Sequence, residues 1–200
     1  MDYEAFKLRS VIFDNKFRIE RKHVEFDSGI SSYEVLVHDI GHNALDIVGF
    51  FKYFQIVSSI GPIEKELHNL IASRTKSASV LQRVAFERRH YLYDEKIHVG
   101  IGGEDYIFKI DGIGPQAVKI TVQITYDEIA NSTKPLESKL RNLINTLYQG
   151  PLNNKVTLDK ISDAWQKEEA HKQKIHEEVL KDEEIRAQKQ KELEDFLNSW

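Results

Sequence analysis

Apolar and polar residues alternate over several short segments of the chain, and this alternation predicts strands. Near the N-terminus, residues 11–13 and 17–19 alternate on either side of Asp14-Asn15, a pair that tolerates a tight turn, so a hairpin is predicted there. Residues 33–37 alternate again and are predicted to form a third strand. Four further strands are expected in the middle of the chain, at 88–93, 96–102, 105–110 and 116–126.

The last of these central strands has the clearest pattern. One face is apolar and consists of Val118, Ile120, Val122, Ile124 and Tyr126. The other face is polar and consists of Lys119, Thr121, Gln123 and Thr125. The glycine-rich stretches at 100–103 and 112–114 lie between predicted strands, so they are expected to be hairpin turns. This pattern predicts an antiparallel meander with one face packed and the other in water.

Helices are predicted in the intervening segments. Residues 44–60 are apolar on most faces, which indicates a buried helix, with Asn43 as its cap. Gly61 is expected to end that helix in the left-handed conformation, and Pro62 to open the next. The following apolar stripe contains Ile63, Leu67, Leu70 and Ile71, and a short helix is expected within 77–87. A later stripe contains Leu136, Leu140, Leu143, Ile144 and Leu147 and should end at Gly150-Pro151.

A single long helix is predicted from Thr157, as its cap, to Trp200. At 1.5 Å per residue, its forty-odd residues would span roughly 65 Å, longer than a body of this size can cover. The predicted fold is therefore α+β, with antiparallel meanders of about three N-terminal and four central strands packed with helices. We expect residues 1–150 to form the globular domain and 151–200 the long charged helix.

Every third and fourth residue of this helix forms a stripe that is partly apolar. Its apolar members cluster at 158–165, 175–179 and 193–200, and charged residues interrupt it between these clusters. This pattern is typical of an interrupted coiled coil or a docking arm. Pairs spaced four apart with the acid first, such as Glu168–Lys172, Glu177–Lys181 and Asp182–Arg186, should support the helix. The residues expected to contact a partner are Ile161, Trp165, Ile175, Val179, Leu193, Phe196, Leu197 and Trp200.

Composition and charge narrow the function further. There is no cysteine, which excludes disulfides, thiolate metal sites and cysteine nucleophiles. No apolar run is long enough to cross a membrane, and the acidic N-terminus is unlike a signal peptide, so a cytoplasmic protein is expected. From Lys155 onward there are 9 Lys/Arg and 12 Asp/Glu, which leaves 19 and 20 in the first 154 residues. Neither part has the basic excess of a nucleic-acid-binding protein.

The stretch "HDIGH" at 38–42 resembles the His-Asp motif of the HD-domain phosphohydrolases. The resemblance covers about five residues and implies a divalent metal held by His38 and Asp39, with His23 as the upstream ligand and Asp94 or Asp127 as the fourth. Such a metal would activate a water for attack on a phosphoester. HD domains are all-helical, whereas residues 33–37 are predicted to be a strand that leads into a turn. The metallohydrolase is therefore an alternative hypothesis.

A second alternative is a nucleic-acid-binding module. Arg88, Arg89, Tyr91 and Tyr93 could pair with phosphates and stack on bases, although a strand with aromatic residues facing the core has the same pattern. The main hypothesis is a non-enzymatic assembly protein without a cofactor. Its long helix would bind a second copy or another protein partner.

Overall fold

The computed structural model describes residues 1–200 except for 59, 75–80, 88 and 199–200, and the side chains of 84 and 196–198. The chain divides into two compact units, Met1–Asn153 and Asn154–Trp200. The α+β fold class is confirmed, with strands and helices both present and a long helix at the end of the chain.

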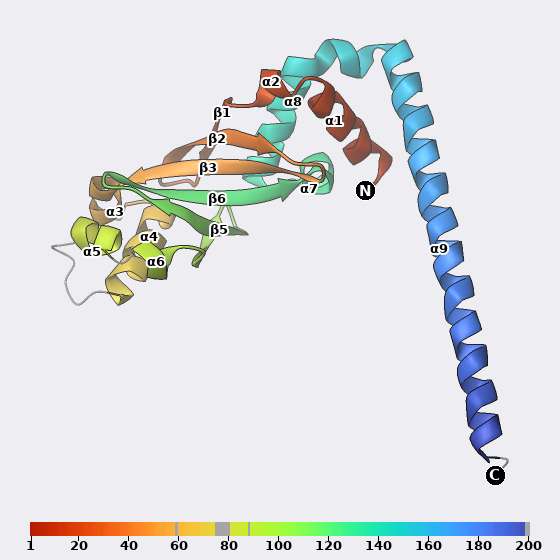
Figure 1. The fold of residues 1–200 in the computed structure, drawn as a ribbon. Helices are drawn as coiled ribbons and strands as arrows, with labels where there is room; N and C mark the ends of the chain where they lie inside the picture. Colours follow the sequence, from red (N-terminus) through yellow and green to blue (C-terminus); the bar gives the residue numbers. More distant parts are fainter. Residues whose placement is uncertain (59, 75–80, 88, 199–200) are drawn as a thin grey trace. The chain divides into compact units, whose positions relative to one another are not determined.

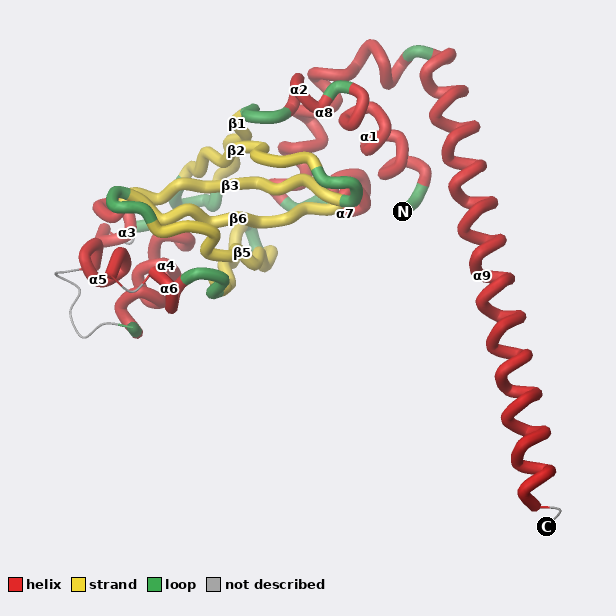
Figure 2. Tube along the Cα trace, in the orientation of Figure 1, coloured by secondary structure: helices red, strands yellow, loops and turns green. Residues whose placement is uncertain are grey.

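The elements follow one another along the chain as shown in Figures 1 and 2. The strands are β1 (His23–Asp27), β2 (Ser32–Ile40), β3 (Ala44–Lys52), β4 (Lys96–Ile101), β5 (Glu104–Ile113) and β6 (Ala117–Thr125). The helices are α1 (Tyr3–Asp14), α2 (Lys16–Ile19), α3 (Tyr53–Ser58), α4 (Pro62–Ser73), α5 (Leu81–Glu87), α6 (Arg89–Leu92), α7 (Tyr126–Asn131), α8 (Pro135–Asn153) and α9 (Lys155–Asn198).

The six strands form one antiparallel sheet in the order β1-β2-β3-β6-β5-β4. Side chains alternate between a buried face and a solvent face, most regularly in β4 and β6. Figure 1 shows α3, α4, α5 and α6 near one end of the sheet, and α1, α2, α7 and α8 near the other. The core of the first unit therefore lies between one face of the sheet and two groups of helices.

The first unit contains a tandem repeat in which each residue from 21 to 73 has a counterpart 73 positions later. Residues 21–73 align without gaps on residues 94–146, and fifteen of the 53 positions are identical. These identities are Gly29, Tyr33, Ile40, Gly41, Ala44, Ile47, Tyr53, Ile56, Ser59, Pro62, Glu64, Leu67, Asn69, Leu70 and Ile71, each with the same residue type 73 places on. The backbone repeats as well, since Arg21 and Asp94 both have positive φ, 62° and 67°. Sequence and structure thus indicate two copies of one strand–strand–strand–helix–helix unit.

An approximate twofold axis relates the two copies through the middle of the sheet. Val48 lies opposite its own counterpart, Thr121, on the neighbouring strand. Both copies also have a bulge at the same place, between Val37 and Asp39 and again 73 residues later between Ile110 and Gly112. The sheet is therefore shared equally between the copies and is continuous across the axis.

Each copy also supplies part of the other's packing. The Tyr53 hydroxyl donates a hydrogen bond to the Gly114 carbonyl oxygen at 2.9 Å, and its counterpart Tyr126 donates to the Gly41 carbonyl oxygen at 3.1 Å. Helix α4 of the first copy packs on β4 of the second, and α8 packs on β1 of the first. Neither copy therefore has a complete core without the other.

The predicted N-terminal hairpin is wrong, because residues 3–14 and 16–19 form helices. The Asp2 side chain caps α1 by accepting a hydrogen bond from the Ala5 amide at 2.9 Å. Ala5, Leu8 and Ile12, spaced by three and four, then fall on one buried side of the helix. Of the alternating pair, Val11 is buried and Phe13 is exposed, so the two do not share a face as they would in a strand.

The predicted helix at 44–60 is also wrong over most of its length. Residues 44–52 form β3, a central strand, and only 53–58 are helical. Asn43 therefore lies in a turn between two strands, where the Gly41 amide donates to the Ala44 carbonyl oxygen at 2.9 Å. Strand β3 has neighbours on both sides and is almost continuously buried, so its sequence resembles that of a buried helix.

Several other boundaries are corrected. Residues 89–92 form α6, where a strand was predicted. Gly61 was predicted to end the preceding helix in the left-handed conformation, but it has φ −90° and is the N-terminal cap of α4. Helix α8 kinks at Tyr148, whose backbone angles are not helical, so its first segment ends two residues before the predicted stop at Gly150 and a short second segment runs to Asn153.

The remaining predicted elements are confirmed. They are the strand at 33–37, the three strands within 96–126, the turns at 102–103 and 114, the start of α4 at Pro62, and a short helix at 81–87; residues 75–80 lie outside the described part. Within the described residues, no helix combines the length and the apolar character that crossing a membrane requires.

Candidate functional site

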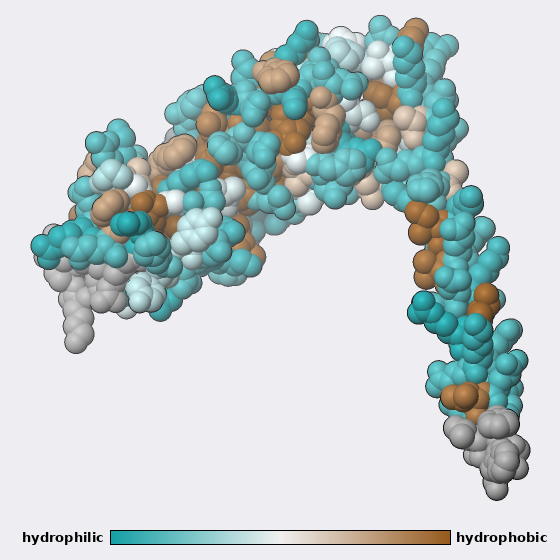
Figure 3. All heavy atoms as spheres, viewed as in Figure 1, coloured by the Kyte–Doolittle hydropathy of each residue, from teal (hydrophilic) through white to brown (hydrophobic). Residues whose placement is uncertain are grey.

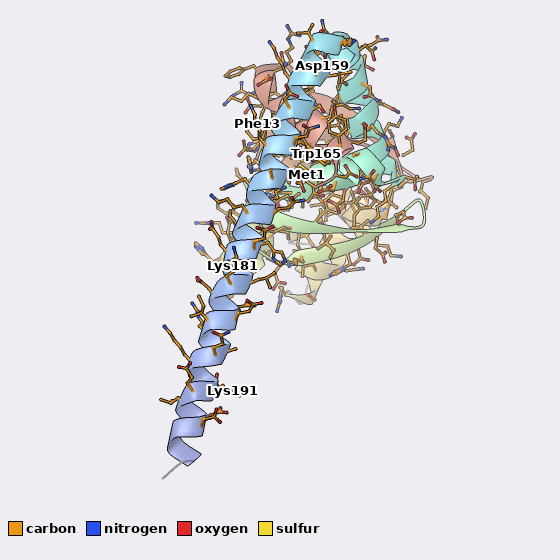
Figure 4. All side chains as sticks on the ribbon, turned by 90° about the vertical axis from the view of Figure 1, so that its right-hand side faces the viewer. Met1, Phe13, Asp159, Trp165, Lys181 and Lys191 are labelled. Carbon is orange, nitrogen blue, oxygen red and sulfur yellow. The ribbon has the colours of Figure 1, made fainter. Side chains whose placement is uncertain are left out.

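Helix α9 is an uninterrupted α-helix of 44 residues. Its cap is Asn154, whose side chain accepts a hydrogen bond from the Thr157 amide at 3.2 Å, so the prediction that Thr157 is the cap is wrong. Figure 4 shows side chains pointing away from α9 in several directions, with Lys181 and Lys191 labelled on its second half. At 1.5 Å per residue the helix is about 65 Å long.

Apolar side chains are exposed along α9 at the predicted spacing. Ile175, Val179 and Leu193 have exposed fractions of 46%, 48% and 61%. Four residues separate the first two, and fourteen separate the second and third, which is two heptads, so all three lie on one stripe. Figure 3 shows brown apolar side chains at intervals among teal polar ones along the helix. Such residues are rarely left in water, because burying each is worth roughly 2 kcal/mol.

Among the described side chains, three further exposed apolar residues of α9 lie off this stripe: Val156, Leu180 and Ile185. Leu180 is 45% exposed and follows Val179, so it points about 100° away around the helix. Ile185 is exposed on another side. Leu180 therefore matches Val179 in burial and size class but faces a different direction.

The other predicted contact residues of α9 are only partly placed. Ile161 and Trp165 lie in its first third and belong to the same three-four spacing, but Ile161 is only 7% exposed and Trp165 is half-buried. Phe196 and Leu197 are within the helix, but their side chains are outside the described part, as is Trp200.

Charged residues occupy the stripe between its apolar members. From the sequence, Lys172, Asp182 and Arg186 were predicted to pair within the helix, and Lys189 only to interrupt the apolar stripe. Lys172 pairs within the helix with Glu168 at 3.2 Å and Glu169 at 2.8 Å, whereas the predicted pairs 177–181 and 182–186 do not form among the described residues. The side chains of 182, 186 and 189 are exposed. They are available to a neighbouring chain.

The His38-Asp39 pair lies on the sheet near the end of β2. His38 is at the bulge, and Asp39 lies directly opposite Asp46 on β3. Both line a hollow of about 530 Å³ on the solvent face, which also contains the three lysines 96, 109 and 119. The Asp46 carboxylate accepts a hydrogen bond from Gln123 at 2.9 Å, and Lys119 pairs with Asp111.

The hollow does not contain a set of metal ligands. Among the described residues, no three His, Asp or Glu side chains lie close enough together to bind one ion. His23 is on β1, where its Nδ1 contacts Glu34 at 2.8 Å. Asp94 pairs with Lys109 at 2.7 Å, and Asp127 contacts the N-terminal residues Met1 and Asp2. The ligands implied by the resemblance are thus distributed over separate elements.

The predicted nucleic-acid cluster lies on α6 and the turn that follows. Tyr91 and Tyr93 are exposed, and Leu92 between them is buried. Arg89 donates to the Phe86 carbonyl oxygen at 3.0 Å and lies over the Phe86 ring, while Arg88 is outside the described part. The next two residues, 94 and 95, are acidic. The cluster therefore has no net basic surface.

Comparison of the chain with protein-family models, with curated proteins and with solved structures found no match. The stripe on α9 combines exposed apolar side chains with the regular spacing of one helix face.

Proposed function

We propose that this protein is a non-enzymatic assembly protein that self-associates through the stripe on α9. The observation that carries this proposal is the exposure of Ile175, Val179 and Leu193 on one side of a helix of 44 residues. A helix in water needs no such stripe, and its charged residues alone would keep it soluble.

The rest of the chain is consistent with a structural role. The core of the first unit is formed by two copies of one repeat, and its buried tyrosine hydroxyls are used in packing. The hollow on the sheet mixes three lysines with three aspartates, and two of them, Lys119 and Asp111, form an ion pair. Within the described residues these groups do not form a nucleophile–base pair or a metal site of the kind that catalysis needs.

Light scattering on the full-length chain tests the proposal. A mass above the 23.3 kDa of one chain is expected for the unaltered protein. Val179→Asp should shift the protein to the monomer, because it places a charge in the middle of the buried stripe.

The matched control is Leu180→Asp. It adds the same charge to the neighbouring residue, which is almost equally exposed but faces another direction. The mass should then remain that of the unaltered protein, and circular dichroism should show equal helix content in both variants. A monomeric unaltered chain, or equal masses for the two variants, would contradict the proposal.

A further inference from the structure

The residues on the stripe of α9 follow one another in an order that is complementary to its own reverse. From residue 161 to 193, the stripe contains Ile161, Trp165, Glu168, Lys172, Ile175, Val179, Asp182, Arg186, Lys189 and Leu193. An acid and then a base follow the first apolar cluster, and an acid and then two bases precede Leu193. Two helices that run in opposite directions would therefore present opposite charges to each other.

A parallel pair of these helices is disfavoured. In a parallel pair each stripe residue faces its own copy. Five layers would then bring like charges together, at positions 168, 172, 182, 186 and 189. Like charges that face each other in these layers oppose association.

An antiparallel pair centred on residue 177 matches the layers from 168 to 186. Lys172 faces Asp182 of the second copy, and Glu168 faces Arg186, and each of these contacts occurs twice. Ile175 faces Val179 at the centre. The same register places Leu193 opposite Ile161 and Lys189 opposite Trp165. Ile161 is only 7% exposed within its own chain, so the match rests on the layers from 168 to 186.

Neighbouring registers lose this match. Sliding the second copy by one heptad places Lys172 opposite Lys189 and Ile175 opposite Arg186. Sliding it the other way places Lys172 opposite Ile175 and Val179 opposite Glu168. The charges therefore select one antiparallel register as well as the direction.

We propose that α9 binds a second copy of the same chain as an antiparallel pair centred on residue 177. This inference rests on the proposed self-association and specifies its partner, direction and register. The first residues of the two helices, Lys155 and its copy, then lie about 65 Å apart along the pair. The two globular units are attached at opposite ends.

Single cysteines test the register, because the chain contains none of its own. Glu168→Cys and Arg186→Cys are prepared separately, one with a mass tag, and then mixed and oxidised. In the antiparallel pair a mixed disulfide should form, because 168 faces 186 of the second copy. Each variant alone should stay uncrosslinked, since residue 168 and its copy are about 27 Å apart, far beyond the roughly 7 Å that a disulfide spans.

The possible results separate this inference from the proposed function. Disulfides within each single variant, with no mixed product, would show a parallel pair and overturn the register while self-association stands. A monomeric unaltered chain overturns both.

Charge exchange provides a second measurement that needs no oxidation. Lys172→Asp alone and Asp182→Lys alone should each raise the dissociation constant at least about tenfold, because each creates two like-charge contacts. The double variant with both changes should recover the original affinity. In a parallel pair neither single change would alter the affinity, because each replaces one like-charge contact by another. Equal affinity in all four proteins would therefore overturn the inference.

Discussion

At the scale of single residues, Tyr33 and Tyr106 perform the same task in the two copies. The Tyr106 hydroxyl donates to the Glu137 carboxylate at 2.8 Å and accepts from the Leu136 amide at 3.1 Å. The Tyr33 hydroxyl makes the matching bonds 73 residues earlier, at 2.7 Å and 3.3 Å. Each tyrosine thus fixes the first turn of a helix against a strand. The two sites differ in burial, because Glu137 is only 3% exposed.

This difference predicts unequal costs for removing the two hydroxyls. Tyr106→Phe leaves a buried carboxylate without its donor, which should lower the free energy of unfolding by about 1–3 kcal/mol. Tyr33→Phe should cost less, because water can reach the more exposed partner carboxylate. Urea unfolding followed by circular dichroism measures both. Tyr91→Phe, at a side chain that is 74% exposed, is the control and should be neutral. Equal values for all three would contradict the assignment.

The buried tyrosines also predict loss of stability in alkali. Burial raises the pKa of the Tyr53 hydroxyl to about 12, and it raises the pKa of Tyr106 and Tyr126 further. In the unfolded chain these groups ionise near pH 10. Their contribution to stability is therefore complete below about pH 10 and is lost as the pH rises through the folded values.

Tyrosinate absorbance and circular dichroism followed together during an alkaline titration measure this effect. Part of the absorbance change should coincide with unfolding above about pH 10. Complete ionisation with the fold intact would contradict the burial of these hydroxyls.

At the scale of elements, the sequence predicted strands correctly where one face of the strand is exposed to solvent. Strand β6 alternates because Val118 and Ile120 are buried while Lys119 and Gln123 lie on the opposite, more exposed face, and it was predicted to within a residue. Strand β3 was missed because its outward residue Val48 is also buried, so the periodicity of two disappears. Short patterns failed at α1 for a related reason. Two apolar residues spaced by two fit a strand and also fit part of a helix.

The sequence predicted those features of the candidate site that depend on one helix alone. The apolar members of the α9 stripe followed from spacing alone, since a helix repeats every 3.6 residues. The significance of its charged members did not, because it depends on a second chain. The tandem repeat could also have been found, since Gly41, Tyr53 and Pro62 each recur 73 residues later.

The capping of α7 gives a prediction at this scale. The Thr125 hydroxyl accepts from the Glu128 amide at 3.2 Å, and the Glu128 side chain accepts from the Thr125 amide at 2.8 Å. Thr125→Ala should lower the free energy of unfolding by about 1 kcal/mol, whereas Thr125→Ser, which keeps the oxygen, should change it little. Thermal unfolding of the two variants measures this difference, and equal melting temperatures would contradict the cap.

At the scale of the whole molecule, the two copies should behave as one folding unit. Strands β3 and β6 pair along their full lengths at the centre of the sheet, and each copy's long helix packs on the edge strand of the other. Unfolding one copy would therefore expose core residues of the other copy. Helix α9, in the other compact unit, is not part of this sheet.

Leu140→Ala tests this cooperativity because the side chain belongs to α8 of the second copy and is completely buried. The substitution should cost about 2–5 kcal/mol. If the unit unfolds as a whole, native-state hydrogen exchange should speed up by the same factor at the slowest amides of β2 and β5, although only the second lies in the altered copy. Leu180→Ala on the exposed side of α9 serves as the control and should leave both strands unchanged. Faster exchange confined to β5 would instead mean that the copies fold separately and that the shared sheet contributes little to their coupling.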